Sequence, residues 1–323
     1  MRTTTYDAQV TATLFDSDGA IFCLGDGSVR FEDGSYNAVH DGAILCAALH
    51  PSGEGVVTGG DDGRVIWSRK SEAGVLATSV KPGQWIDAID ASAESKLIAF
   101  SSGRTLSVID AADAFFRRDF EHERTVSGVA FDPRGRRIAT STYGGAALWY
   151  ARIDKQKPTM LKWAGSHTGV VFSPDGAFLV TTMQDAQLHG WRLKDSKDMR
   201  MGGYPSKVRS LAFLSKGQLM ATSGAQGAVL WPFVGANGPM GKDATEIGYD
   251  EGSLVTLVAA RTEHGVLAAG LDDGRVWHAE PAGQGLNFLK ADRGAAIVAL
   301  AMSPDGQRVA WADEDGNAGV AEA

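Results

Sequence analysis

Side chains that can transfer protons, bind metal or form buried hydrogen bonds recur at regular distances in this 323-residue chain. A histidine or aromatic ring precedes several apolar segments, an aspartate follows many of them, and a tryptophan ends many of them. The most complete series are His40, Asp62 and Trp67, then His122, Thr142 and Trp149, then Asp185 and Trp191. Each series occurs once per repeated segment. We therefore expect the series to lie apart, and not to converge on one catalytic or metal site.

The segments that position these residues share one pattern. An apolar strand leads into a turn resembling Phe-Ser-Pro-Asp-Gly, a second apolar strand follows, and an Asp-Gly turn precedes a third strand ending in tryptophan. The clearest copy is VVFSPDGAFLVTTMQDAQLHGW at 170–191. The residues matching its phenylalanine are Phe15, Leu49, Ala91, Phe131, Phe172, Phe213, Ala260 and Met302. Their mean spacing of about 41 residues lies within the period of propeller repeats.

The chain resembles the WD40 repeat family over nearly its whole length, although no copy ends in the Trp-Asp dipeptide. The resemblance implies an all-β fold with a single β-propeller domain over 1–323. We predict eight four-stranded blades, with seven as the alternative. The repeat units are 9–40, 41–80, 81–122, 123–163, 164–204, 205–250, 251–292 and 293–323. The segment 2–8 is expected to complete the last blade and so remove an exposed sheet edge.

The same resemblance assigns the recurring residues a structural role. In the family, a buried hydrogen-bonded set links a histidine, a serine or threonine, an aspartate and the tryptophan of one blade. His40, Asp62 and Trp67 look like one set, with Gly60 where the family has serine. The second set, with His122 and Trp149, uses Thr142 and lacks the aspartate. His167 falls four positions after the expected histidine and is predicted to be a loop residue.

Composition narrows the classes of partner. The formal net charge is -8 and the isoelectric point about 5.4, which argues against nucleic acid and anionic membranes because both attract basic proteins. No apolar stretch approaches the roughly 18 residues of a membrane span. The first residues do not resemble a signal peptide. We expect a cytoplasmic monomer without a cofactor.

The candidate interaction residues come from two features. By resemblance, the position six residues before each repeat phenylalanine rims the central channel, where Trp85 and Lys207 stand out. Acidic Asp-Gly turns are expected near the same face, and their residues are Asp61, Asp62, Asp272 and Asp273. Together they predict a partner protein or peptide of basic character. The Gly-rich segment 235–253 is the longest connection and is predicted to be mobile.

The sequence thus favours a non-enzymatic scaffold for protein–protein or protein–peptide interaction. One alternative is a propeller hydrolase, lactonase-like, or a quinoprotein with a metal on the channel axis. Such a site needs converging carboxylates or histidines, and the rim positions hold none. Another alternative is an accessory partner of a metal-homeostasis GTPase, which no residue supports. No P-loop, CxxC or HExxH motif is present.

Overall fold

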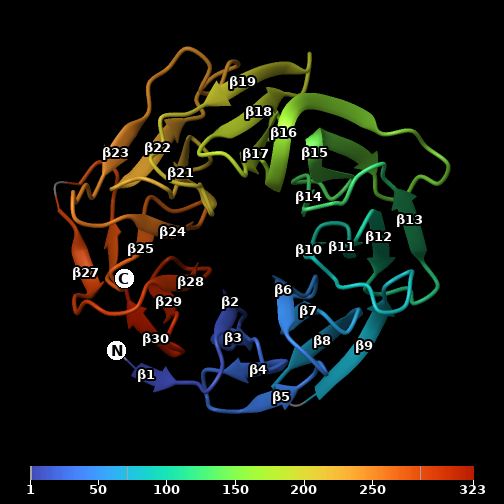
Figure 1. Cartoon of the computed structure of the whole chain (residues 1–323), viewed down its shortest axis with the longest axis horizontal. Coiled ribbons are helices and arrows are strands. Elements are labelled where there is room, and N and C mark those ends of the chain that lie inside the picture. The colour runs from blue at the N-terminus through green and yellow to red at the C-terminus, as the bar shows by residue number, and fades with distance from the viewer. Residues whose placement is uncertain (1, 71, 284) are drawn as a thin grey trace. The chain divides into compact units, whose positions relative to one another are not determined.

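The computed structural model describes residues 2–70, 72–283 and 285–323, which fold into strands and turns without a helix. Within these residues the strands form seven sheets, six of four strands and one of six (Figure 1). Neighbouring strands that follow one another in the chain pair antiparallel through short turns. The chain divides into two compact units.

The first unit comprises Met1–Phe15, Ala186–Leu188 and Met199–Ala323. One of its sheets has the order β1-β30-β29-β28, and the others follow chain order. Its strands are β1 (Arg2–Thr5), β2 (Val10–Phe15), β20 (Leu211–Leu214), β21 (Leu219–Thr222), β22 (Ala228–Pro232), β23 (Thr245–Ile247), β24 (Val255–Ala260), β25 (Leu267–Leu271), β26 (Val276–Ala279), β27 (Asn287–Lys290), β28 (Ile297–Met302), β29 (Arg308–Asp313) and β30 (Asn317–Glu322).

The two ends of the chain meet in the first unit. The strand β1 pairs antiparallel with β30, from Arg2 opposite Val320 to Thr5 opposite Asn317 (Figure 1). The Thr5 hydroxyl donates a hydrogen bond of 2.9 Å to Asn317 Oδ1. The predicted completion of the last blade by the N-terminal strand is confirmed. This pairing covers the edge of β30 that would otherwise be open.

The second unit comprises Asp16–Asp185 and His189–Asp198, and β18 and β19 cross its border. Its strands are β3 (Ala20–Leu24), β4 (Ser28–Phe31), β5 (Tyr36–Ala38), β6 (Ile44–Leu49), β7 (Val56–Gly60), β8 (Arg64–Arg69), β9 (Glu72–Thr78), β10 (Ala88–Ser92), β11 (Leu97–Ser102), β12 (Thr105–Asp110), β13 (Arg117–Glu121), β14 (Gly128–Phe131), β15 (Arg137–Tyr150), β16 (Thr159–Phe172), β17 (Phe178–Met183), β18 (Leu188–Arg192) and β19 (Lys197–Met201).

The six-stranded sheet joins two of the predicted repeat units. The long strand β16 pairs with β15 through residues 159–166 and with β17 through residues 167–172. No proline or aspartate interrupts the sequence TMLKWAGSHTGVVF, so nothing forces a turn at the predicted border near residue 164. Counted as hydrogen-bonded sheets, the described chain has seven blades and not the predicted eight separate four-stranded ones.

Burial decreases from the middle strands of the sheets to the outer ones. All residues of β7, β11 and β17 are buried, whereas six of the seven residues of β9 are exposed. The apolar side chains of the middle strands pack between neighbouring sheets of the same unit, as Val57, Val65 and Phe100 do. This packing fixes the turns at the strand ends, which carry the candidate site.

The segment 235–253 is only partly a loop. It contains β23, which pairs with β22 from Ala228 opposite Ile247 to Leu230 opposite Thr245. The Lys242 amino group also donates a hydrogen bond to the Val234 carbonyl. The segment therefore completes a four-stranded sheet, a role that sequence inspection missed.

Candidate interaction site

The first predicted acidic turn, residues 61–63, connects β7 to β8 and is held by its second aspartate. Asp62 Oδ1 accepts a hydrogen bond from the Arg64 backbone N–H at 3.0 Å and lies 2.9 Å from His40 Nδ1. Its Oδ2 accepts from the Asp41 backbone N–H at 3.2 Å and pairs with Arg64 Nε at 3.1 Å. Gly63 has a φ of 75°, which favours glycine. Both oxygens of Asp62 are thus used, by His40, Asp41 and Arg64.

The buried ring beneath this turn pairs with a threonine of β7. His40 Nε2 lies 2.9 Å from Thr58 Oγ1, and the imidazole is almost fully buried. A Cβ atom at Gly60 would lie 2.8 Å from Asp62 Oδ1 and closer still to His40. The hydroxyl partner therefore sits two residues earlier than predicted, and Gly60 leaves room for the ring. Trp67 does not join this set, because its Nε1 donates to the Glu54 carbonyl at 3.1 Å.

In the second predicted set the hydroxyl partner also sits two residues earlier than predicted, but here the tryptophan takes part. His122 Nε2 contacts Thr140 Oγ1 at 2.9 Å and receives a hydrogen bond of 3.0 Å from Trp149 Nε1, whereas the Thr142 hydroxyl donates to the Tyr143 carbonyl. In the first unit, Tyr204 replaces the histidine and contacts Thr222 Oγ1 at 2.7 Å.

His167 occupies the ring position of its repeat, and was wrongly predicted to be a loop residue. It is fully buried in β16, and its Nδ1 lies 2.8 Å from Thr181 Oγ1. Trp191 packs against His167 with ring centroids 5.8 Å apart, while Asp185 is exposed. Burial lowers the pKa of His167, as it does for His122. Burial therefore favours the neutral form of these imidazoles, which form hydrogen bonds inside the sheet.

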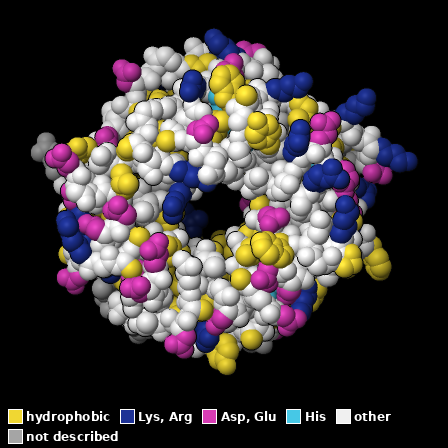
Figure 2. Space-filling model, in the orientation of Figure 1, with side chains coloured by type: hydrophobic (Ala, Val, Ile, Leu, Met, Phe, Trp, Pro, Cys, Tyr) yellow, Lys and Arg dark blue, Asp and Glu magenta, His cyan; other side chains and the backbone are white. Residues whose placement is uncertain are grey.

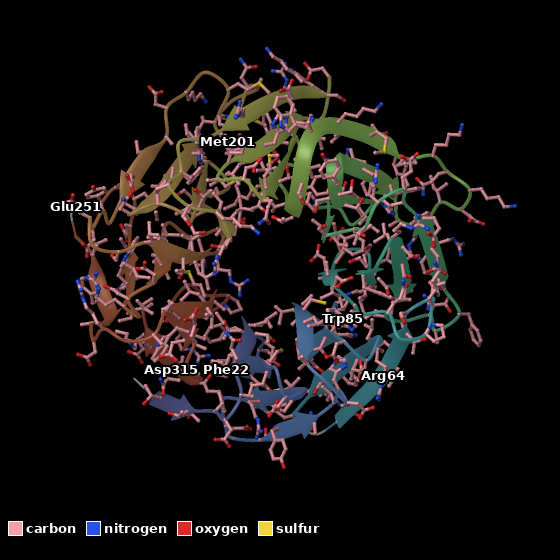
Figure 3. All side chains as sticks on the ribbon, in the orientation of Figure 1. Phe22, Arg64, Trp85, Met201, Glu251 and Asp315 are labelled. Carbon is pink, nitrogen blue, oxygen red and sulfur yellow. The ribbon has the colours of Figure 1, made fainter. Side chains whose placement is uncertain are left out.

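Trp85 lies in the connection from β9 to β10 and is 58% exposed (Figure 3). The next residue, Ile86, is fully buried, and its backbone N–H donates to the Gly60 carbonyl at 3.1 Å. The Asp87 backbone N–H donates to the Ser101 carbonyl at 3.0 Å. These contacts fix the backbone beside the indole and place it next to the turn at 61–63.

Two aspartates belong to the segments that meet here: Asp87 comes two residues after Trp85, and Asp61 follows Gly60, whose carbonyl is bonded to the Ile86 N–H. Figure 2 shows acidic side chains on both sides of an exposed hydrophobic one, at the place where Figure 3 labels Trp85. The Asp61 carboxylate has no hydrogen bond or ion pair with any described residue. Partial burial raises the pKa of Asp87, and its Oδ2 accepts a long hydrogen bond of 3.4 Å from the Gly103 N–H. We call Trp85, Asp61 and Asp87 the tryptophan site.

The second predicted acidic turn, in the first unit, connects β25 to β26. Asp273 accepts two hydrogen bonds from Arg275 Nε, at 2.8 and 3.1 Å, and lies 3.4 Å from Arg293 Nε. Burial alone would raise the pKa of Asp273, but the Arg275 hydrogen bonds hold it below its ordinary value. Asp272 is exposed and accepts from the Leu254 N–H at 2.8 Å.

The six predicted interaction residues are distributed over both units. Trp85, Asp61 and Asp62 belong to the second unit, and Lys207, Asp272 and Asp273 to the first. Lys207 is half-buried in the connection to β20, beside the buried Val208. In the second unit the backbone bond from Ile86 to Gly60 joins the segments that carry Trp85 and Asp61, and Asp87, which sequence inspection did not single out, lies two residues after Trp85.

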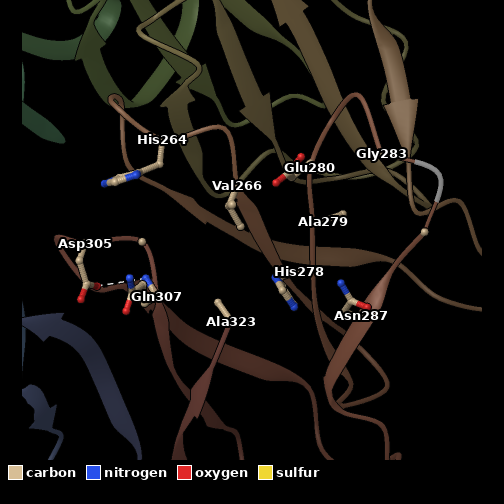
Figure 4. Close-up of a pocket in the computed structure, with 12 residues that line it drawn as sticks. His264, Val266, His278, Ala279, Glu280, Gly283, Asn287, Asp305, Gln307 and Ala323 are labelled. Carbon is tan, nitrogen blue, oxygen red and sulfur yellow. Dashed lines mark hydrogen bonds between the residues drawn. The ribbon is translucent and has the colours of Figure 1, made fainter.

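A pocket of about 530 Å³ lies in the first unit (Figure 4). Its polar lining includes His264, His278, Glu280, Asn287 and Gln307. His264 stands where other repeats have the glycine of the Pro-Asp-Gly turn, a departure that could have indicated this pocket. Among the described residues, no group of three or more histidine, cysteine, aspartate or glutamate side chains is arranged to hold a metal ion.

The blade arrangement, the N-terminal strand and the buried ring–hydroxyl pairs define a repeat protein of the β-propeller class. Residues 36–67 match the family model described as WD domain, G-beta repeat. The chain therefore carries a WD40 repeat. This repeat contains His40, Thr58, Asp62 and Trp67.

Comparison with solved structures supports the fold. The crystal structure of the computationally designed Ika8 protein, in a packing in P63, has a TM-score of 0.78 with this chain. The alignment covers 99% of this chain and 98% of Ika8 at 17% sequence identity. No curated protein matches the chain. None of the described segments is a helix long and apolar enough to cross a membrane.

Proposed function

We propose that this protein is a non-catalytic binding module that takes a basic segment of a partner protein at the tryptophan site. WD40 propellers are typically binding scaffolds, and a fold of this class acts through sites on its loops. The observation that carries the proposal is the exposure of Trp85 directly before a backbone that is fixed by hydrogen bonds at Ile86 and Asp87. An exposed indole on a rigid loop gives up little entropy when a partner binds.

The neighbouring charges determine the kind of partner. A lysine or arginine side chain is attracted to the face of an indole, and the carboxylates of Asp61 and Asp87 add a favourable charge interaction. The Asp62 carboxylate takes no part, because His40 and Arg64 already use it. The site therefore favours one basic side chain stacked on Trp85, with carboxylates beside it.

A positional-scanning peptide library tests this function. The purified protein is expected to enrich lysine or arginine at one position, and Trp85→Ala is expected to abolish the enrichment. Phe115→Ala is the control, because Phe115 is 99% exposed in the same unit but lies in a different connection, between β12 and β13. The selected peptides are then measured individually by fluorescence anisotropy.

The outcomes separate the proposal from its rivals. Enrichment of acidic or purely apolar residues would contradict a basic partner. Selection of the same peptides by Trp85→Ala would exclude the tryptophan site as the binding surface. Asp61→Asn with Asp87→Asn is expected to weaken the same peptides while leaving the fold intact, since both side chains are at the surface.

A further inference from the structure

A second charged surface of the second unit lies at the turn between β14 and β15. A pocket of about 550 Å³ is lined there by Arg134, Arg136, Arg137, Tyr150 and Asp175, among others. Its residues come from two repeats, because Pro174, Asp175 and Gly176 form the corresponding turn before β17. The protein as a whole is acidic, so a concave surface rich in arginine differs from the average charge of the chain.

The carboxylates of this pocket are already bound. The buried Asp132 accepts hydrogen bonds from the backbone N–H groups of Arg136 and Arg137, at 2.8 and 3.1 Å. Its other oxygen accepts from Arg137 Nε at 3.0 Å. Asp175 accepts from the Ser173 hydroxyl at 2.5 Å and from the Ala177 N–H at 3.0 Å. Neither carboxylate forms a hydrogen bond or ion pair with the side chains of Arg134 or Arg136.

Arg134 and Arg136 are the side chains left over. Both are exposed, and neither guanidinium makes a hydrogen bond or ion pair with any described residue. The backbone that carries them is held, because Gly135 between them closes the turn with an N–H to Asp132 carbonyl bond of 2.8 Å. Two arginines without a side-chain partner thus line the pocket from one turn.

The pocket lining also includes a polar aromatic ring, on a backbone that is hydrogen-bonded. Tyr150 is 54% exposed. Its backbone N–H donates to Gln156 Oε1 at 2.8 Å, and Gln156 Nε2 donates back to its carbonyl at 2.7 Å. Arg137 stacks over the Phe172 ring with its Cζ 5.6 Å from the centroid. Tyr150, Arg134 and Arg136 thus line one pocket, and a phenol and two guanidiniums can donate several hydrogen bonds to an anionic ligand.

From this arrangement we propose that the pocket binds an acidic peptide segment of a partner through two glutamate or aspartate carboxylates. A guanidinium matches a carboxylate in a two-pronged hydrogen-bonded pair. Two separate arginines fit two separate carboxylates, one for each. Because the pocket is distinct from the tryptophan site and opposite in charge preference, the two sites would recognise different segments.

The test measures fluorescence anisotropy of a labelled peptide, Gly-Ser-Gly-Glu-Gly-Glu-Gly-Ser, titrated with the full chain at low ionic strength. We expect saturable binding, and no binding of the peptide with glutamine in place of glutamate. The double variant Arg134→Ala/Arg136→Ala is expected to bind at least about tenfold more weakly. Arg124→Ala/Arg209→Ala removes the same charge from exposed arginines outside the pocket, and is expected to bind like the wild type.

Further variants and peptides test whether carboxylates and guanidinium groups make the contact. Arg134→Lys/Arg136→Lys keeps the charge but loses the planar fork, so binding between those of the wild type and the alanine variant supports the proposal. Equal weakening by the two alanine double variants would overturn it in favour of a general charge effect. A phosphoserine peptide that binds while the glutamate peptide does not would overturn the carboxylate assignment. Inorganic phosphate that displaces neither peptide supports recognition of the peptide itself.

Discussion

The same five residues, Asp-Asp-Gly-Arg-Val, form a turn in each unit, at 61–65 and at 272–276. The backbones are alike: the glycines have φ values of 75° and 83°. The surroundings differ, because Asp62 reaches the buried His40 whereas Asp273 pairs with Arg275 and Arg293. Trp85 follows the first turn and Ala296 holds the matching place after the second. An identical peptide can therefore support a hydrogen bond to a buried histidine in one place and a half-buried cluster with two arginines in another.

The largest expected difference between the turns concerns stability. Asp62→Ala removes a hydrogen-bond partner from the buried His40 and should cost about 2–3 kcal/mol. Asp273→Ala removes a partly exposed ion pair and should cost below about 1 kcal/mol. Urea unfolding of both variants measures this, with Asp61→Ala as the control that leaves both networks intact. Equal losses at Asp62 and Asp273 would remove the distinction drawn between the turns.

Substitution of the turn glycines should have similar effects on stability in both turns, unlike substitution of the aspartates. A Cβ atom at Gly63 would lie 2.7 Å from the Gln84 carbonyl oxygen, and one at Gly274 would lie 2.6 Å from that of Ala295. Because both also have positive φ, Gly63→Ala and Gly274→Ala should each lower the unfolding free energy by about 1–3 kcal/mol. Thermal and urea unfolding would report it. A much larger cost at one turn would show that the backbones are not equivalent.

The tryptophan should matter for binding and little for stability. Trp85→Ala is expected to weaken an arginine-containing peptide by about tenfold or more, with an unfolding free energy within about 0.5 kcal/mol of the wild type. Ala296→Trp places an indole at the second turn, where Asp273 is already paired with arginines. We expect no gain in binding there by fluorescence anisotropy. A gain would mean that the indole alone, without free carboxylates, makes the site.

The smallest effect is a dependence on pH at the second turn. The pKa of Asp273 lies below its ordinary value, so its contribution is fully present above the unfolded pKa of about 3.9 and is lost as the pH falls through the folded value. The stability difference between wild type and Asp273→Asn should therefore be constant from pH 7 to about 5 and narrow below about 4. A difference that widens toward acid would contradict the ion pairing described for Asp273.

Much of the buried structure could be read from local pattern. The repeated turn, the apolar strands and the ring before each first strand follow from short stretches of sequence, and so did the N-terminal strand that completes the last sheet. The hydrogen-bond partners of the rings were harder to predict from the sequence. His40 and Thr58 are 18 residues apart, and the choice of Thr58 over position 60 depends on how β7 packs against the ring.

The candidate site shows the same limit. Trp85 and Asp61 could be singled out by type and position, but Asp87 could not, because nothing in its neighbourhood marks a carboxylate beside an exposed indole. Arg134 and Arg136 belong to the sequence DPRGRR, which by itself indicates only a solvated turn. Only the neighbouring turn at 174–176, brought close by the shared sheet, makes it concave.

The sequence by itself determined the repeat, the strand and turn types and the all-β propeller, because these depend on residue periodicity and on turn chemistry within a few positions. The tertiary structure alone decided that two repeats share the continuous strand β16. It also decided which carboxylates stay unpaired: Asp62 is used by His40 and Arg64, while Asp61 is not. Such hydrogen bonds and ion pairs join residues that are distant in the chain. The local sequence pattern therefore cannot predict which distant residue becomes the partner.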